Sequence, residues 1–269
     1  MPERVLITGG AGRIGTMLRP RLAREGRTLR LLDRVPIGSP SGAEETVLAD
    51  VTDLPALIEA AKDCHAIVHL GGIAGEDTWD AISATNIQGT YSVFEAARAA
   101  GVPRVIFASS NHAVGFVPRT SAPVSPTEFF APDTYYGVSK VAGEALASLY
   151  ADRYGIDALC LRIGSCFDEP SNTRMLSTWL SPDDCGRLVE AALTTPDPGF
   201  AVVWGISANT RAWFDLGPGR ALGFDPLDDA EKYAPELIAR DGDPDRTVLP
   251  HSRVGGDFCS PALDAPLPA

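Results

Sequence analysis

Short apolar runs alternate with amphipathic stretches along the first 165 residues of the chain. The run at residues 5–8 (VLIT) predicts a strand, and the stretch after it predicts a helix, because apolar residues recur at helical spacing between Ile14 and Leu22. We expect further strands at residues 28–32, 46–49, 66–70, 104–108 and 156–163, and further helices at residues 54–62, 79–100 and 136–154. Continuous apolar strands that alternate with helices are typical of a parallel sheet covered on both faces. The pattern therefore predicts an α/β fold with a doubly wound parallel sheet of the Rossmann type.

The chain after residue 165 is less regular. We expect a helix at residues 181–193 and a strand at residues 200–206, followed by a tail rich in Pro, Asp and Gly from Asp243 onward. This order predicts a Rossmann core over residues 1–165 and a smaller substrate-binding portion over residues 166–269, which returns part of its chain to the core. The tail is expected to cover the surface, or a neighbouring subunit of a homo-oligomer.

Composition excludes several classes of protein. The 269 residues include 23 basic and 35 acidic side chains, so the net charge is −12, whereas a nucleic-acid binder needs a basic face. The five cysteines show no CxxC pair and the four histidines show no metal-ligand spacing, which favours a reduced chain without a metal site. No apolar run approaches the about 18 residues of a membrane span, and the first strand leaves no room for a signal peptide. A cytoplasmic protein is expected.

A glycine-rich turn separates the first predicted strand from the first predicted helix. Gly9, Gly12 and Gly15 there permit a tight turn and let the backbone approach a pyrophosphate at the helix N-terminus. Asp33 ends the second strand, where its carboxylate can accept both hydroxyls of an adenosine ribose and repel a 2′-phosphate. NAD is therefore favoured over NADP, although the adjacent Arg34 could restore NADP binding. The structural alternative is a plain turn with a capping aspartate.

Other strand ends add candidate cofactor contacts, because ligands of such sheets bind beyond the C-terminal ends of the strands. Asp50 and Val51 end the third strand, where a carboxylate can meet the adenine amino group. Leu70, Gly71 and Gly72 end the fourth strand, where small residues let a cofactor pass close to the backbone. The remaining expected cofactor contacts are Arg13, Ile14, Tyr136, Lys140, Ile163 and Cys166.

A tyrosine and a lysine four residues apart form the candidate catalytic pair. Tyr136 and Lys140 fall on one side of a predicted helix, whereas Tyr135, five residues from the lysine, points elsewhere. A tyrosine normally titrates near pH ~10, but a neighbouring ammonium and a nicotinamide cation would favour its phenolate and make it a usable base. Ser110 follows the fifth strand and could hydrogen-bond the same substrate oxygen. The alternative is a surface tyrosine and a solvated lysine on an ordinary amphipathic helix.

The TGGAGRIG loop, the serine after the fifth strand and the YxxxK helix together resemble the short-chain dehydrogenase/reductase superfamily in its extended, sugar-handling branch. Longer stretches resemble the uronate dehydrogenase family: residues 68–73 (VHLGGI), 107–112 (FASSNH), 162–166 (RIGSC), 172–179 (NTRMLSTW) and 203–209 (VWGISAN). This resemblance implies NAD-dependent oxidation of D-glucuronate and D-galacturonate at the anomeric carbon, which gives the aldaric acid lactone.

The residues in these stretches suit such a substrate. Arg174 can hold a uronate carboxylate with two parallel hydrogen bonds, and an acidic protein needs a local cation of this kind. Asn111, His112 and Ser165 follow strand ends and can meet sugar hydroxyls, beside Ser110 and Tyr136. Taken alone, each residue has a structural alternative: Arg174 as a surface arginine, His112 as a helix-cap or packing histidine, and Cys166 as a small packing residue. Where the relatives have a serine after Gly-Gly-Ile, this chain has Ala74, which predicts a substrate grip weaker by about 1 kcal/mol and leaves the preferred uronate open.

Three other functions share parts of this pattern. A nucleotide-sugar epimerase or dehydratase has the same loop and helix but needs a larger C-terminal lobe, and only 105 residues follow Gly164 in this chain of 269. A non-catalytic dinucleotide sensor typically lacks the tyrosine or the lysine, and both are present here. A dehydrogenase of neutral aldoses would not need Arg174.

Overall fold

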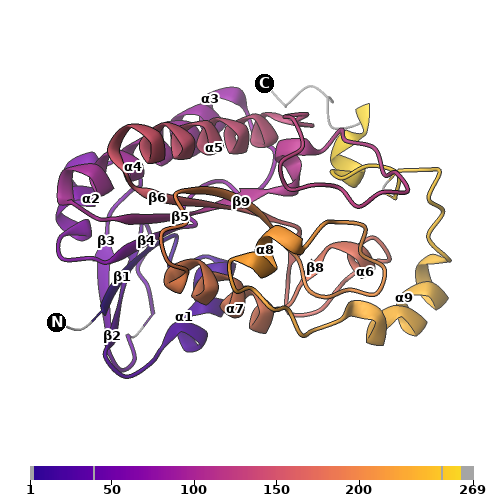
Figure 1. The fold of residues 1–269 in the computed structure, drawn as a ribbon, viewed down its shortest axis with the longest axis horizontal. Helices are drawn as coiled ribbons and strands as arrows, with labels where there is room; N and C mark the ends of the chain where they lie inside the picture. The colour runs from indigo at the N-terminus through magenta and orange to yellow at the C-terminus, as the bar shows by residue number, and fades with distance from the viewer. Residues whose placement is uncertain (1–2, 39, 250, 262–269) are drawn as a thin grey trace.

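A seven-stranded parallel sheet forms the centre of the computed structural model, which describes residues 3–38, 40–249 and 251–261 (Figure 1). In the sheet the order is β3-β2-β1-β4-β5-β6-β9. The strands are β1 (Glu3–Thr8), β2 (Arg27–Asp33), β3 (Glu44–Leu48), β4 (Ala66–His69), β5 (Arg104–Ser110), β6 (Asp157–Ile163) and β9 (Phe200–Gly205). Two short strands, β7 (Ser165–Cys166) and β8 (Trp179–Leu180), pair separately. Strand order reverses between β1 and β4, so a crevice for a ligand is expected at that point. The predicted doubly wound α/β fold is confirmed.

Helices cover both faces of the sheet (Figure 1). One face carries α1 (Arg13–Leu22), α7 (Pro182–Thr194) and α8 (Gly217–Ala221), and the other carries α2 (Leu54–Ala61), α4 (Gln88–Ala100) and α5 (Tyr135–Tyr154). The remaining helical segments are α3 (Trp79–Ile82), η1 (Ser83–Ile87), η2 (Asn111–Val114), α6 (Met175–Thr178), η3 (Ala230–Tyr233), α9 (Ala234–Asp241) and η4 (Gly256–Cys259). None of the helices in the described ranges is long and apolar enough to cross a membrane.

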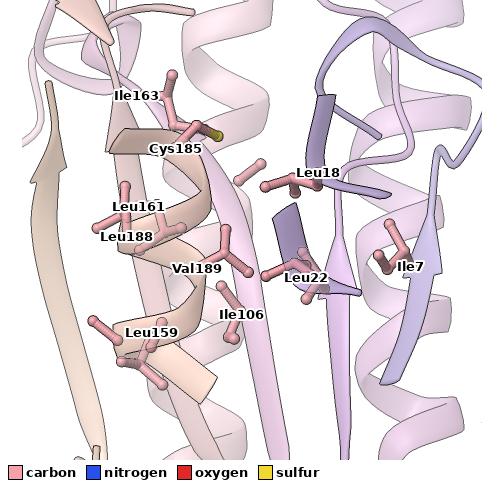
Figure 2. Close-up of a cluster of buried hydrophobic side chains, with 14 of the residues drawn as sticks. Ile7, Leu18, Leu22, Ile106, Leu159, Leu161, Ile163, Cys185, Leu188 and Val189 are labelled. Carbon is pink, nitrogen blue, oxygen red and sulfur yellow. The ribbon is translucent and has the colours of Figure 1, made fainter. Parts of the chain in front are cut away.

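Each face of the sheet has its own hydrophobic core, because successive strand residues point to opposite faces and both sets are apolar. Figure 2 shows the core beneath α1 and α7, where Leu22 and Val189 meet Ile106 of β5, and all three are almost fully buried. Leu6 of β1 and Phe94 of α4 belong to the second core on the opposite face. By packing on the sheet, the buried faces of α1 and α7 hold the glycine loop, which precedes α1, at one edge of the sheet.

The long helix expected at residues 79–100 is divided into α3, the π-helical turn η1 and α4. Asn86 lies in this π-helical turn, and its side-chain hydrogen bonds account for the widening of the helix there. Its amide accepts a hydrogen bond from the Ile73 backbone N–H (2.7 Å) and donates to the Ile73 carbonyl (3.0 Å) and to the Ser139 hydroxyl (3.1 Å). Widened helical turns of this kind concentrate at functional sites. Here the turn ties the loop after β4 to helix α5.

The C-terminal portion contributes to the same sheet and then returns to the ends of β5 and α5. Strand β9 pairs with β6, and α7 packs on α1. In the tail, Val254 is fully buried and the Gly255 N–H donates to the Gly115 carbonyl (2.8 Å). Residues 251–261 therefore pack on their own chain, which agrees with the expectation that the tail covers the surface, while a contact with a neighbouring subunit stays a prediction. The end of that expected tail, residues 262–269, lies outside the described residues.

Candidate active site

The glycine loop at the start of α1 has a geometry that only glycine allows. Gly9 has a φ of +73°, and a Cβ there would lie 2.8 Å from the Gly71 nitrogen. A Cβ on Gly15 would lie 2.4 Å from the Gly9 carbonyl oxygen. Gly12 is the N-cap of α1 and supplies no capping side chain, so the first N–H groups of the helix remain for a ligand. This arrangement suits a pyrophosphate at the helix N-terminus.

A cavity of about 790 Å³ runs from this loop along the C-terminal ends of the strands. Its volume is in the range of ligand-binding pockets. Every residue expected to contact the cofactor lies on its wall: Gly9, Gly12, Arg13, Ile14, Gly15, Asp33, Arg34, Asp50, Val51, Leu70, Gly71, Gly72, Tyr136, Lys140, Ile163 and Cys166. The wall also includes Ser110 and its expected companion Ser109, Ala74, and residues that the sequence analysis missed: Ile73, Asp77, Thr85, Ala108, Gly164 and Phe167. Of these, Phe167 could have been found, because it directly follows Cys166; its ring lies under the Arg13 guanidinium, at 4.2 Å.

Two carboxylates mark the end of the cavity nearest β2 and β3. Asp33 accepts hydrogen bonds from the N–H groups of Ala11 (3.0 Å) and Val35 (3.2 Å), which join the glycine loop to the end of β2. At Asp50, the Thr52 backbone N–H (2.9 Å) holds the pKa of the carboxyl below its usual range. Both groups are therefore placed for hydroxyl and amino donors of an adenosine.

Replacing Asp33 with Asn tests the preference for NAD. The amide oxygen can still accept from Ala11, so the loop is kept, but the negative charge that repels a 2′-phosphate is lost. We expect the ratio of kcat/KM for NADP to that for NAD to rise at least about tenfold. Steady-state rates with each cofactor measure the ratio. The control variant, Asp50→Asn, should change kcat/KM for NAD and for NADP by the same factor. If the ratio rose in this control as much as in Asp33→Asn, the role of Asp33 would be contradicted.

Helix α5 places the candidate catalytic pair on the cavity wall. Its first turn is held by Glu76, whose carboxylate accepts the backbone N–H groups of Tyr135 (3.1 Å) and Tyr136 (2.9 Å). One turn later, the Lys140 ammonium donates to the Ala108 carbonyl (2.8 Å) and lies 5.3 Å from the centre of the Tyr136 ring. The pair is thus anchored to the loop after β4 and to the end of β5.

The protein's own groups leave the pKa of Tyr136 above its ordinary value. Burial raises it to about 12, and the hydrogen bond with Ser110 opposes this only in part. Burial likewise lowers the pKa of Lys140 to about 8, against the carboxylate of Glu144. Both shifts have the same cause, since a buried site disfavours the charged form of each group. A further cation beside the phenol is needed to make it a base near neutral pH.

A buried ion pair lies behind Lys140 and was missed in the sequence. Arg162 of β6 donates from Nε (2.9 Å) and Nη2 (2.8 Å) to the two carboxylate oxygens of Glu144, and the Ser109 hydroxyl donates to the same carboxylate (2.6 Å). All three side chains are almost fully buried. The signal was the spacing, because Glu144 follows Lys140 by four residues on the same helix.

The other expected substrate residues lie beyond the cavity wall, and the tail gathers three of them. The Val254 carbonyl accepts hydrogen bonds from the Asn111 amide (2.9 Å) and from Nη2 of Arg174 (2.6 Å). The His112 ring lies edge-on to the Tyr136 ring, 5.8 Å between centres. Ser165 is not in this group; its hydroxyl is buried against the Thr178 hydroxyl (2.9 Å).

Arg174 is partly buried, and its described contacts include no ion pair within the part of the chain that the structure describes. Burial lowers its pKa, although Asp257 and Asp133 oppose the shift. Across residues 3–38, 40–249 and 251–261, no carboxylate forms an ion pair with it. Burial of a lone guanidinium is costly unless an anion completes it.

Comparisons with known proteins agree with this site. The family model of the NAD dependent epimerase/dehydratase family matches residues 5–192. Uronate dehydrogenase of Agrobacterium fabrum is 44% identical over 95% of this chain and 96% of that protein. The crystal structure of glucuronic acid dehydrogenase from Chromohalobacter salexigens has a TM-score of 0.91 at 42% identity and covers 96% of this chain and 97% of that one.

A variant of uronate dehydrogenase from Agrobacterium tumefaciens, solved in complex with NAD, has a TM-score of 0.90 at 42% identity and covers 96% of this chain and 97% of that one. The cradle of glycines, the orphan N–H groups of α1 and the carboxylate of Asp33 fit this cofactor. The chain belongs to the NAD dependent epimerase/dehydratase family, as an NAD-dependent oxidoreductase acting on CH–OH groups in the branch that contains the uronate dehydrogenases.

Proposed function

We propose that this chain oxidises D-glucuronate and D-galacturonate at the anomeric carbon with NAD and releases the aldaric acid lactone. The observation that carries the proposal is the partly buried Arg174, whose pKa burial lowers and which forms no ion pair in the described part of the chain, although Asp257 and Asp133 lie near enough to oppose the shift. It shares the Val254 carbonyl with Asn111, which follows Ser110, and so lies on the side of the site where a sugar would meet Tyr136.

A carboxylate is the ligand that suits this arginine. One Nη2–H bond is used on Val254, which leaves donors of the guanidinium fork for two parallel hydrogen bonds to a carboxylate. A protein with a net charge of −12 repels anions overall, so a local cation must recruit one. A neutral sugar would leave the partly buried guanidinium without a carboxylate paired directly to it.

The mechanism uses groups already in place. Tyr136, as phenolate, removes the proton of the anomeric hydroxyl while the Ser110 hydroxyl holds that oxygen. The Lys140 ammonium near the ring stabilises the phenolate. NAD bound along the cavity supplies the hydride acceptor and a positive charge beside the phenol. Because the substrate is a closed hemiacetal, loss of hydride from its carbon gives the lactone directly.

Absorbance at ~340 nm, which reports reduced nicotinamide, tests the proposal with NAD and, separately, glucuronate, galacturonate and glucose. We expect signal with both uronates and none with glucose. Equal rates with glucose would favour the neutral-aldose dehydrogenase. Silence with all three, together with turnover of a UDP-sugar, would favour the nucleotide-sugar epimerase or dehydratase.

Replacing Arg174 with Ala should raise KM for the uronates by roughly tenfold to a hundredfold, the effect of losing hydrogen bonds to a charged group. The affinity for NAD should not change, because Arg174 does not line the cofactor cavity. Initial rates over a range of glucuronate concentrations measure KM. Arg98→Ala, which removes an exposed arginine paired with Glu95 on α4, is the control and should leave KM as it is. An unchanged KM in Arg174→Ala would mean that the carboxylate is held elsewhere.

A further inference from the structure

Asp133, which the sequence analysis did not single out, holds the ring of His112. Its side chain is fully buried, and one carboxylate oxygen lies 2.7 Å from Nδ1 of His112. The other oxygen accepts a hydrogen bond from the Thr134 hydroxyl (3.0 Å). Asp133 stands just before helix α5, so it connects the start of that helix to the segment after β5.

Glycines from two distant segments make room for this carboxylate. A Cβ on Gly115, after η2, would lie 1.9 Å from Oδ2 of Asp133, and a Cβ on Gly255, in the tail, would lie 1.8 Å from the same atom. Neither glycine has a positive φ, so backbone conformation does not require glycine at either position. What requires glycine is the space that the Asp133 side chain occupies. Three parts of the chain are thus built around one carboxylate.

The contact determines which nitrogen of His112 carries the hydrogen. An ionised carboxylate only accepts hydrogen bonds, so Nδ1 is the donor, and in the neutral ring Nε2 keeps its lone pair. The ring plane is fixed by Phe258, which stacks on it at 4.2 Å between centres, and by the edge-on contact with Tyr136. In the ranges that the structure describes, Nε2 has no hydrogen-bonding partner.

We propose that Asp133 is a positioning residue that fixes His112 in the Nδ1–H tautomer, so that Nε2 accepts a hydrogen bond from a ring hydroxyl of the sugar next to Tyr136. The proposal rests on the function proposed above for the sugar, but the tautomer itself does not depend on it. A fixed acceptor selects substrates that present a hydroxyl at that point and orients the ring before proton transfer. Asp133 acts only through His112 and does not touch the sugar.

Asp133→Asn tests the proposal without changing the shape of the side chain. The Thr134 hydroxyl accepts the Gly137 N–H (3.0 Å) and so donates to residue 133, which keeps the amide oxygen of the variant on the Thr134 side. The amide NH2 then faces Nδ1 of His112 and forces the opposite tautomer, with the hydrogen on Nε2.

The tautomer is measured by ¹⁵N NMR of the histidine side chains along a pH series that reaches the neutral ring. Signals of His112 are assigned by their loss in His112→Asn. We expect Nδ1–H in the wild type and Nε2–H in Asp133→Asn, together with a KM for glucuronate raised roughly tenfold to a hundredfold and an unchanged Kd for NAD. A wild-type ring with Nε2–H would overturn the proposal even if the variant failed to fold.

Asp184→Asn is the matched control. The Asp184 side chain is also fully buried, where it accepts the backbone N–H groups of Leu227 (2.9 Å) and Asp228 (3.0 Å), and it does not line the cavity. It should lower the melting temperature without changing KM or the tautomer. An Asp133→Asn protein that keeps the wild-type KM and the wild-type tautomer, as the control is expected to do, would also overturn the proposal. If the wild type fails to oxidise uronates, the proposed function fails, while the NMR result still decides the role of Asp133.

Discussion

Replacing Tyr136 with Phe is expected to lower kcat by at least about a hundredfold while nearly keeping the affinity for NAD. The change removes one oxygen, the only atom of the side chain that can take the proton of the anomeric hydroxyl, and keeps the ring against His112 and Lys140. The glycine loop and Asp33, which also line the cofactor cavity, are untouched. Initial rates at saturating glucuronate give kcat, and quenching of tryptophan fluorescence by NAD gives Kd.

Tyr135 provides a matched control for this change. It is the adjacent tyrosine of the same helix turn, but it is half-exposed and its ring packs edge-on against Trp79 instead of lining the cavity. Tyr135→Phe should therefore keep kcat within about twofold of the wild type, as surface changes usually do. Retained turnover in Tyr136→Phe would remove Tyr136 from the role of base.

Replacing Glu144 with Gln should lower the free energy of unfolding by about 3–5 kcal/mol. The amide has nearly the same shape as the carboxylate, but it leaves the guanidinium of Arg162 buried without a counter-charge. Breaking a buried pair is costly because the remaining charge has lost its water and gained no partner. Urea denaturation followed by circular dichroism measures the change.

The control for Glu144 is Glu190→Gln at the opposite end of the sheet. Glu190 also pairs with a buried arginine, Arg27, but it is partly exposed and Glu3 remains as a second partner. A clearly smaller loss is expected there, because solvent and Glu3 compensate. Equal losses of unfolding free energy in the two variants would show that full burial does not make the Glu144–Arg162 pair more important for stability than the partly exposed pair.

The sheet and the cofactor cavity could be predicted from the sequence because both depend on local patterns. Alternating apolar strands and helices define a parallel sheet, and in such a sheet all strands end at one edge. A glycine at position 9, an acid at position 33 and a YxxxK helix must then meet along that edge, and the structure places them on the wall of one cavity. No long-range contact had to be guessed.

The rest depends on burial and on contacts between distant residues, which no local pattern reports. The π turn at Asn86 has the same alanine-rich pattern as an ordinary helix, and only its contact with Ile73 shows why it widens. The YxxxK spacing does not reveal how deeply Tyr136 is buried, and burial raises the pKa of Tyr136 in the protein alone. Asp133 was overlooked because its partners, Gly115 and Gly255, belong to separate segments.

Because the tail returns to the active site, the residues that line the cofactor cavity and the tail residues of the proposed sugar site are encoded in different parts of the gene. Within the described part of the chain, the last residue on the wall of the cofactor cavity is Phe167, whereas the carbonyl and ring that complete the sugar side come from Val254 and Phe258. A ribosome therefore finishes the wall of the cofactor cavity well before the last residues of the proposed substrate site. On the function proposed above, substitutions near the 3′ end of the gene act on the sugar side and leave the wall of the cofactor cavity unchanged.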